Sequence, residues 1–238
     1  MGNLEYDGRM DDLDGDGYAL ADITLADHQC EHIASSLPSV VGAPRGGIRN
    51  LLWHPTVVRL LNHERLGAYL WSVIGRDLVA VKATLFDKTG EANWRVQWHQ
   101  DRAIAVRDRH HVVGYGPWSS KAGVLHVEPP SEVLAQMLAV RIHLDESGAE
   151  SGPLRVIPGT HRGGKLTDDE LARAVGEGRM AELHVPRGAL LLMRPLLVHS
   201  SSIASAPQHR RVLHIEFAPP DAISPLHWHS IVTLKRAA

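Results

Sequence analysis

The spacing of hydrophobic residues changes its period part-way along this chain. After one early strand at Gly17–Ile23, hydrophobic residues recur every three to four positions up to about residue 75, as in amphipathic helices. This spacing predicts three helices, at Thr24–Leu37, His54–Leu61 and Glu64–Ile74. Gly75, directly after the third, is a common residue for ending a helix.

From residue 78 onward the chain consists mainly of short runs of alternating or continuous apolar residues, which are typical of strands. Such runs occur at Leu78–Phe86, Ala103–Arg107 and Met137–Leu144. Two further helices are predicted among them, at Ser131–Met137 and Thr167–Val175. A helical layer followed by many short strands predicts a mainly β protein, a double-sheet jelly roll with flanking helices outside one sheet.

Composition narrows the class of protein. At 238 residues the chain can bury a sizeable core, and we expect one domain covering residues 1–238. The formal net charge of -2 and the lack of a basic block argue against a nucleic-acid-binding protein. Cys30 is the only cysteine, which excludes an intrachain disulfide and fits a cytoplasmic protein. No secretory signal and no membrane association are expected, because the apolar runs are too short to cross a bilayer.

A histidine followed two positions later by an acid is the motif that suggests chemistry. The chain has 16 histidines, so a single such pair is weak support for a metal site, and the pair occurs at four places: His99/Asp101, His126/Glu128, His143/Asp145 and His214/Glu216. His143 lies inside a continuous strand-like run, where alternation alone explains the spacing. His99 and Asp101 instead follow a Gly- and Asn-containing loop and open a new strand, which favours a site.

A third ligand lies far downstream, at His199. Two imidazoles and one carboxylate form the ligand set of non-heme Fe(II) oxygenases. They bind one face of the metal and leave its other positions open. Arg210, about one strand later, would hold the far carboxylate of a dicarboxylate cosubstrate in a bidentate pair. The residues therefore predict an oxygenase that uses Fe(II) and 2-oxoglutarate. The ligand types alone do not fix the metal, because zinc, nickel and cobalt also bind such sites.

Two other acidic or histidine-rich segments are interpreted as structural. Asp12, Asp14 and Asp16 copy the first half of an EF-hand loop, but the twelfth position is Ile23, where calcium needs a glutamate. A solvated acidic turn is predicted there. Near the other end, His227-Trp228-His229 has a composition suited to metal, and a surface strand is the favoured interpretation.

Four segments in order resemble the phytanoyl-CoA dioxygenase-like (PhyH) family: Trp98–Asp101, Gly152–Arg162, Pro186–Leu192 and the closing His199 to Arg210. The resemblance covers roughly residues 17–218. It implies a double-stranded β-helix, with a core over roughly residues 78–218, whose mouth holds Fe(II) and 2-oxoglutarate. The middle loops differ from those of the phytanoyl-CoA enzyme, and no coenzyme A signature is present, so the family does not fix the substrate.

The resemblance also implies roles for individual residues. His99, Asp101 and His199 would hold Fe(II), and 2-oxoglutarate and O2 would take the remaining positions. Ser201, Thr84 and Arg141 match positions that face the cosubstrate, together with Arg210. Arg211 is the rival of Arg210, since neighbouring strand residues face opposite ways; Arg210 is favoured, because it shares a face with polar His214 and Glu216.

The implied reaction is hydroxylation of a small metabolite, with release of succinate and CO2. Related halogenases have a small residue in place of the carboxylate, so Asp101 favours hydroxylation. One alternative is a cupin-like, metal-dependent isomerase or hydrolase, which would leave Arg210 and Ser201 without a task. Another is a non-catalytic binding protein, which a buried triad argues against, because unpaired buried polar groups are costly.

The substrate itself is poorly defined by the sequence, and the oligomeric state is left open. A carboxylate-bearing substrate would explain the cations expected around the mouth, which are Arg45, Arg49, Lys82, Lys88 and Arg141. The loop Asp108–Trp118 is long, aromatic and Gly-bearing, as expected of a lid. The candidate substrate contacts are Arg49, Lys88, Asn93, Trp94, Trp118 and His126, and contact with 2-oxoglutarate is the alternative for Arg49.

Overall fold

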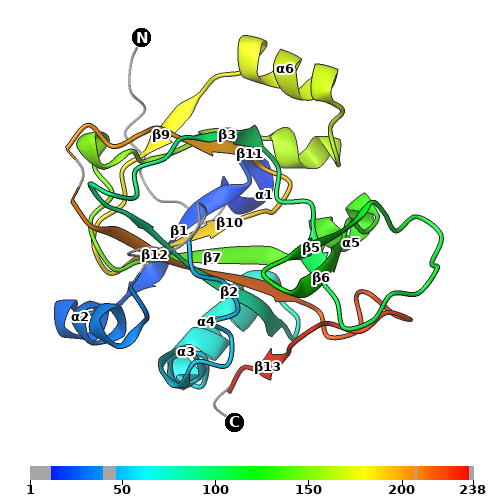
Figure 1. Ribbon diagram of the computed structural model, residues 1–238, viewed down its shortest axis with the longest axis horizontal. Helices are drawn as coiled ribbons and strands as arrows, with labels where there is room; N and C mark the ends of the chain where they lie inside the picture. The colour runs from blue at the N-terminus through cyan, green and yellow to red at the C-terminus, as the bar shows by residue number, and fades with distance from the viewer. Residues whose placement is uncertain (1–11, 40–46, 207, 236–238) are drawn as a thin grey trace.

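Two antiparallel β-sheets lie face to face in the computed structural model, which describes residues 12–39, 47–206 and 208–235 (Figure 1). This arrangement confirms the predicted mainly β, double-sheet fold. The larger sheet has the strand order β1-β10-β7-β12-β2-β13. Its strands are β1 (Tyr18–Thr24), β10 (Ala189–Met193), β7 (Leu138–His143), β12 (Arg210–Ala218), β2 (Val79–Lys88) and β13 (Val232–Thr233).

The smaller facing sheet has the order β3-β11-β8-β9. Its strands are β3 (Val96–His99), β11 (Val198–Ser201), β8 (Leu154–Ile157) and β9 (Ala181–Leu183). A third, three-stranded sheet extends one end of the molecule, with the order β4-β6-β5, as seen at the right of Figure 1. It consists of β4 (Ile104–Ala105), β6 (Val124–Val127) and β5 (Trp118–Lys121).

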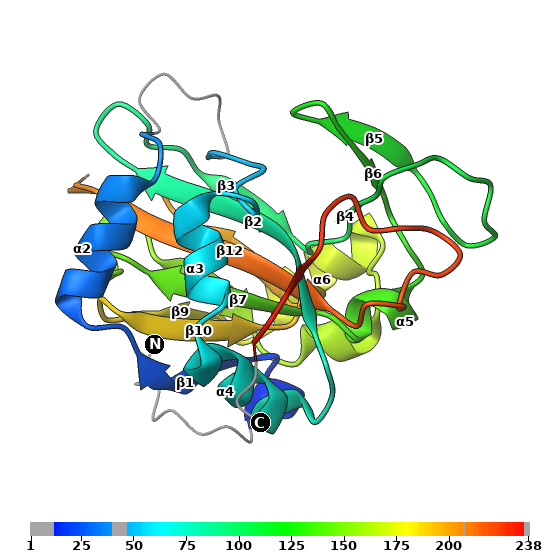
Figure 2. The ribbon, with the colours of Figure 1, turned by 90° about the horizontal axis from the view of Figure 1, so that it is seen from below.

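Three helices cover the outer face of the larger sheet (Figure 2). They are α2 (Asp27–Ser36), α3 (Pro55–Leu61) and α4 (Glu64–Ile74). Their apolar faces pack against outward residues of the central strand β12, among them Leu213, Ile215 and Phe217, which are fully buried. The alternate residues of β12 therefore face the other way, into the space between the sheets.

Most helix boundaries agree with the sequence pattern. Helix α4 ends at Gly75, whose φ of 71° is left-handed, a conformation that glycine adopts without strain. The helix predicted from Thr24 was wrong at its start: Thr24 is still paired with Ala189 in β1, and α2 begins only at Asp27. The backbone hydrogen bonds offered by the edge of the sheet outweigh the helical spacing there.

The other α-helices are α1 (Asp12–Gly15), α5 (Ser131–Ala135) and α6 (Asp168–Glu177), and two short 3-10 helices lie at Ala149–Ser151 and Thr160–Gly163. The Thr167 hydroxyl accepts from the Glu170 backbone N–H and the Glu170 carboxylate accepts from the Thr167 N–H, which forms a capping box at the start of α6. Within the EF-hand-like segment, Asp14 is ion-paired with Arg194 at 2.7 Å.

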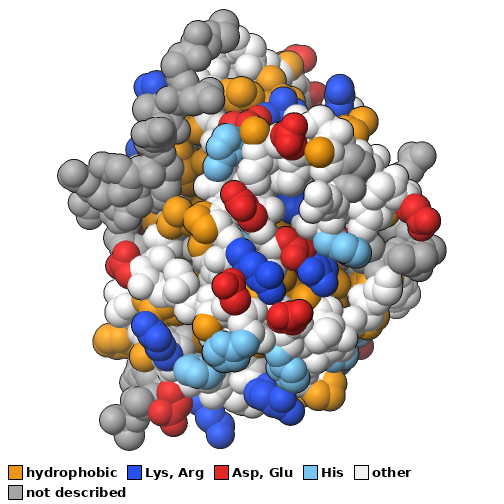
Figure 3. All heavy atoms as spheres, turned by 90° about the vertical axis from the view of Figure 1, so that its left-hand side faces the viewer, with side chains coloured by type: hydrophobic (Ala, Val, Ile, Leu, Met, Phe, Trp, Pro, Cys, Tyr) orange, Lys and Arg blue, Asp and Glu red, His pale blue; other side chains and the backbone are white. Residues whose placement is uncertain are grey.

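The surface mixes charges of both signs. On the face shown in Figure 3, basic and acidic side chains lie intermingled over the middle of the view. None of the helices in the described ranges combines the length and apolar composition that a bilayer crossing requires. Charge is distributed quite differently in the space between the sheets, where cations outnumber carboxylates.

The helical layer is expected to carry much of the stability without affecting the site between the sheets. Leu213 is fully buried under this layer, so Leu213→Ala should lower the free energy of unfolding by about 2–5 kcal/mol, the cost of a core cavity. Urea unfolding would measure this loss. Val113→Ala, at a side chain that is 89% exposed, should change stability little, and a similar loss in both variants would contradict this account.

Candidate active site

A cavity of about 780 Å³ lies between the two large sheets and is lined from both of them. The larger sheet contributes polar residues of β2, β7 and β12, and the smaller sheet contributes residues of β3, β8 and β11. The predicted ligands His99, Asp101 and His199 all line this cavity. They form the one cluster of three or more potential metal ligands among the residues that the structure describes.

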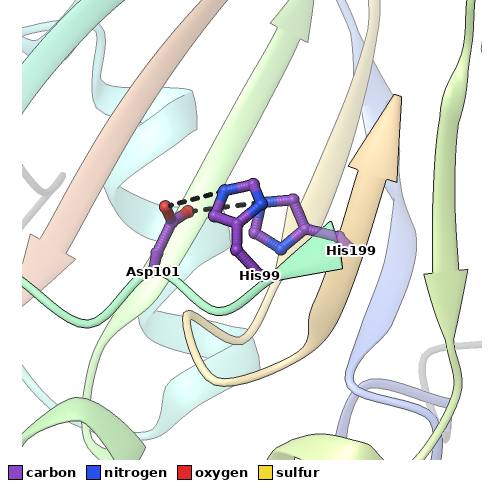
Figure 4. A group of neighbouring side chains, drawn as sticks. All are labelled: His99, Asp101 and His199. Carbon is purple, nitrogen blue, oxygen red and sulfur yellow. Dashed lines mark ion pairs between the residues drawn. The ribbon is translucent and has the colours of Figure 1, made fainter. Parts of the chain in front are cut away.

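The pairing of β3 with β11 brings the two histidines together. His99 ends β3 and stands directly opposite His199 of β11, with ring centroids 4.2 Å apart. Asp101 lies just beyond the strand, and Figure 4 shows its carboxylate facing both rings. Its two oxygens are each 3.7 Å from an imidazole Nε2, one from each histidine. All three ligand atoms therefore lie within 4.8 Å of one another.

Gln100 holds the segment between two of these ligands. Its buried amide donates to the backbone carbonyls of Leu196 and Gly164, at 2.7 and 2.9 Å. Its oxygen accepts from the N–H of Leu166, at 2.9 Å. A ligand loop fixed by three hydrogen bonds has less freedom to lose when a metal binds.

Both imidazoles have the tautomer that a metal needs. The Nδ1 of His99 lies 2.8 Å from the Gln97 carbonyl, and the Nδ1 of His199 lies 2.8 Å from the Leu197 carbonyl. A carbonyl only accepts, so Nδ1 carries the proton in each ring and Nε2 keeps its lone pair. This backbone orientation of the second ring nitrogen is typical of metal-binding histidines.

The charges of the triad also favour a cation. Burial lowers the pKa of His199 to about 4, so this ring is neutral near pH 7 and able to ligate. Burial alone would raise the pKa of Asp101, but His199, His214 and His99 nearby hold it well below its usual range. Two imidazoles with an ionised carboxylate match the ligand set of Fe(II) oxygenases. The residues present thus fit an iron.

Three cations gather at one end of the cavity, which we call the inner end: Lys88, Arg141 and Arg210. Lys88 and Arg210 are direct partners across β2 and β12. Lys88 donates to the Ser201 hydroxyl at 3.0 Å and to the Ser202 carbonyl, and Arg210 donates to the Gly152 carbonyl at 2.8 Å. Arg141 contacts the His214 ring, with Nη1 3.3 Å from Nδ1.

These inner cations lack counter-charges from the protein. Within the described residues, no carboxylate lies at ion-pair distance from any of the three. Burial together with Arg210 and Arg141 lowers the pKa of Lys88 to about 7, and burial lowers that of Arg210 to about 9. Thr84 Oγ1, Arg141 Nε and Arg210 Nε are also buried without a hydrogen-bond partner. Such a pocket suits an anion rich in acceptors.

Arg210 and Arg211 lie on opposite faces of β12. Arg210 points into the cavity with His214 and Glu216, as strand parity predicted. Arg211 is on the outer side, where it makes a bidentate pair with Asp145 at 2.7 and 2.7 Å.

The other predicted site residues separate into two groups. Arg49, Lys88, Asn93, Trp94, Thr84, Arg141 and Ser201 line the cavity. Trp118 and His126 are not among its lining residues, and neither is any other residue of the predicted lid, Asp108–Trp118. Trp118 instead has Arg109 stacked over its ring at 5.3 Å, and His126 is buried with Nδ1 bonded to the Val124 carbonyl. Arg45 lies outside the described residues.

Sequence reasoning missed several cavity residues. Lys121, Glu128, His214 and Glu216 all line the cavity. The parity of β12 does place His214 and Glu216 on the face of Arg210, so a signal for these two existed. The tail histidines His227 and His229 are exposed on either side of buried Trp228, which makes an isolated bridge to Val106, so the surface strand predicted there was wrong.

A family comparison settles the class of this site. The family model of phytanoyl-CoA dioxygenase (PhyH) matches residues 46–212. The chain belongs to the PhyH family. Its resemblance to that family is therefore confirmed, and this PhyH protein is a non-heme enzyme that uses iron and 2-oxoglutarate. A search of curated proteins finds no significant match.

Solved structures share the fold of this PhyH protein. AviO1 from Streptomyces viridochromogenes Tue57 has a TM-score of 0.65 at 23% identity, over 94% of this chain and 99% of that chain. EctD from S. alaskensis, solved with 2-oxoglutarate and 5-hydroxyectoine, has a TM-score of 0.66 at 19% identity, over 93% of this chain and 80% of that chain. The epimerase SnoN, solved with Fe3+, alpha ketoglutarate and nogalamycin RO, has a TM-score of 0.66 at 15% identity, over 89% of this chain and 82% of that chain.

Proposed function

We propose that this PhyH protein hydroxylates a small molecule, with His99, Asp101 and His199 as the iron ligands. The observation that carries the proposal is the intact triad, with both imidazoles in the ligating tautomer and Asp101 ionised beside them. The Asp101 carboxylate occupies the position that a halogenase would leave to halide. The relatives of known structure catalyse varied reactions, including epimerisation and carbocyclisation, so hydroxylation is the finer step of the proposal.

The residues of the inner end would bind and orient 2-oxoglutarate. Arg210 offers a buried guanidinium to its far carboxylate, and Lys88 and Ser201 lie beside it. Thr84 of β2 and Arg141 of β7 also line the cavity, on either side of His214 in β12. Lys88, Arg141 and Arg210 are buried, and low exposure to water strengthens these charge interactions. Lys88, expected from the sequence near the substrate, is therefore reassigned to the cosubstrate.

The overall reaction balances as R–H + O2 + 2-oxoglutarate → R–OH + succinate + CO2. Bound iron supplies the activation of O2 and the removal of hydrogen from the substrate carbon. Two of the four electrons that reduce O2 come from 2-oxoglutarate and two come from the C–H bond. One oxygen atom enters the substrate and the other enters succinate.

The proposal can be tested before the substrate is known. Incubation of the Fe(II) protein with 2-oxoglutarate under ¹⁸O2 should give succinate that carries one ¹⁸O atom, through slow turnover without substrate. Absence of succinate, with metal alone stabilising the fold, would overturn the proposal in favour of the cupin-like isomerase or hydrolase. A metabolite screen should then yield a product 16 mass units heavier, or 18 under ¹⁸O2; a product of unchanged mass would point to epimerisation.

Lys88 predicts a pH dependence of cosubstrate binding. Its folded pKa of about 7 is below the ordinary 10.5, so the group is mostly charged at pH 6 and mostly neutral at pH 8. A bound carboxylate requires the charged form, so 2-oxoglutarate affinity should fall about tenfold from pH 6 to pH 8. Without ligand the same shift makes Lys88 destabilising below pH 7, and this cost is relieved as pH rises toward 10.5.

Calorimetric titration of 2-oxoglutarate into the Mn(II) protein, without oxygen, would measure this slope and the proton taken up on binding. Lys88→Met should flatten the pH dependence, whereas Lys235→Met, at an exposed lysine, should leave it unchanged. An equally steep slope in Lys88→Met would contradict the assignment of Lys88 to the cosubstrate.

A further inference from the structure

The opposite, outer end of the cavity carries a second group of cations: Arg49, Lys82 and Lys121. Lys82 is already neutralised, because its ammonium lies 2.6 Å from the Glu216 carboxylate. Arg102, also at this end, is paired with Glu128 at 2.9 Å. Arg49 and Lys121 have no carboxylate at ion-pair distance in the part of the chain that the structure describes. Arg49 and Lys121 therefore line the cavity without a counter-charge from the described residues.

A side-chain to backbone hydrogen bond joins the two segments that carry these cations. The Asn50 side-chain amide donates to the Ala122 carbonyl at 3.3 Å, which joins the segment after Arg49 to the β5–β6 turn after Lys121. Asn50 and Ala122 have φ values of 61° and 50°, the two left-handed non-glycine residues of the described chain. Such conformations are costly and cluster at functional sites. Ile48, paired with Leu85, fixes the same segment to β2.

The two cationic groups belong to different ligands. Lys121 is influenced by Lys82 and Arg49, and burial together with these charges lowers its pKa; Lys88 is influenced by Arg210, Arg141 and Arg155. On the facing strand β11, Ser201 bonds to Lys88 and His199 lies two residues away, so the metal ligands are set apart from the inner end. A cosubstrate that joins the inner end to the metal leaves the outer cations without an anion. The molecule on the other side of the metal is the substrate.

We infer that Arg49 and Lys121 form an anion subsite, which binds a carboxylate or a phosphate group of the substrate. The inference rests on the proposed function, because it takes the inner end to hold 2-oxoglutarate. A planar guanidinium and a flexible ammonium that line the same cavity suit either oxyanion. The subsite would fix the distance between the anionic group of the substrate and the carbon presented to the metal. Lys121 is exposed and Arg49 is half-buried, so both remain accessible to a ligand that enters the cavity.

The test uses small probes on the Mn(II) protein saturated with 2-oxoglutarate, without oxygen and at low salt. Benzoate and phenyl phosphate are the anionic probes, and benzamide is the neutral control of similar shape. We expect at least one anion to bind and to raise the melting temperature, whereas benzamide does neither. The stronger of the two anions identifies the group. Arg49→Gln and Lys121→Gln should each weaken its binding about tenfold, the value of one charge-assisted hydrogen bond.

Controls separate this inference from the proposed function. Arg179→Gln, at an exposed arginine of the surface, should bind the probe as the wild type does. Binding of 2-oxoglutarate should be unchanged in Arg49→Gln and Lys121→Gln. Equal binding of anions and benzamide, competition between the anion and 2-oxoglutarate, or loss of 2-oxoglutarate binding in Arg49→Gln would each overturn the subsite alone. Failure of the wild type to bind 2-oxoglutarate would instead overturn the proposed function.

Discussion

Replacing His199 by alanine is expected to abolish 2-oxoglutarate-dependent formation of succinate. His199 is the most buried member of the triad, and its Nε2 lies 3.7 Å from the Asp101 carboxylate. Removing a ligand atom should cost more metal affinity than the roughly 10- to 100-fold that is lost when a residue hydrogen-bonded to a ligand is replaced. Equilibrium dialysis of Mn(II), without oxygen, would measure the affinity, and a succinate assay would measure turnover.

The comparison needs a histidine variant that leaves the cavity intact. His184 is exposed and paired only with Glu182 at the surface, so His184→Ala should keep full metal affinity and turnover. The metal-free His199→Ala protein should still melt cooperatively, because the ring contributes one hydrogen bond, to the Leu197 carbonyl. Wild-type metal binding in a folded His199→Ala protein would remove this residue from the ligand set.

The triad was predictable because its geometry is encoded locally. His99 and Asp101 lie two residues apart at a strand end, and the β3–β11 pairing places His199 directly opposite His99. Strand parity likewise assigned Arg210 to the cavity, since a period of two leaves only two faces to choose between. The His99/Asp101 pair and the face of Arg210 needed only the spacing along one strand, whereas His199 was identified from the ligand set and the family resemblance.

The outer end of the cavity was not predictable in the same way. Lys121 reaches it because one hydrogen bond joins Asn50 to Ala122, 72 residues apart, and no spacing in the sequence indicates that contact. Trp118, on the same strand β5, was the residue chosen from the sequence, but Lys121 at the other end of that strand is the one that lines the cavity. The aromatic residues of Asp108–Trp118 suggested a binding loop. The packing of the β5–β6 hairpin instead decides which end of β5 approaches the site.

The second large effect is expected at the cosubstrate. Arg210→Ala should raise the dissociation constant of 2-oxoglutarate about a hundredfold, because a buried, bidentate pair with a carboxylate is lost. Titration of 2-oxoglutarate into the Mn(II) protein would measure this, and Mn(II) affinity itself should change little, since Arg210 is not a ligand. Added methylguanidinium should restore part of the binding if the guanidinium acts through the carboxylate.

Arg211→Ala is the matched control for this prediction, since it removes the same group one residue further along β12. Arg211 lies on the outer side and is paired with Asp145, a contact that raises its pKa. Its loss should lower the melting temperature while leaving the 2-oxoglutarate affinity within about threefold of the wild type, because no contact with the cavity is removed. A larger effect on 2-oxoglutarate in Arg211→Ala than in Arg210→Ala would mean that the far carboxylate does not bind at the inner end. The inner cations, Lys88 among them, would then require another anion.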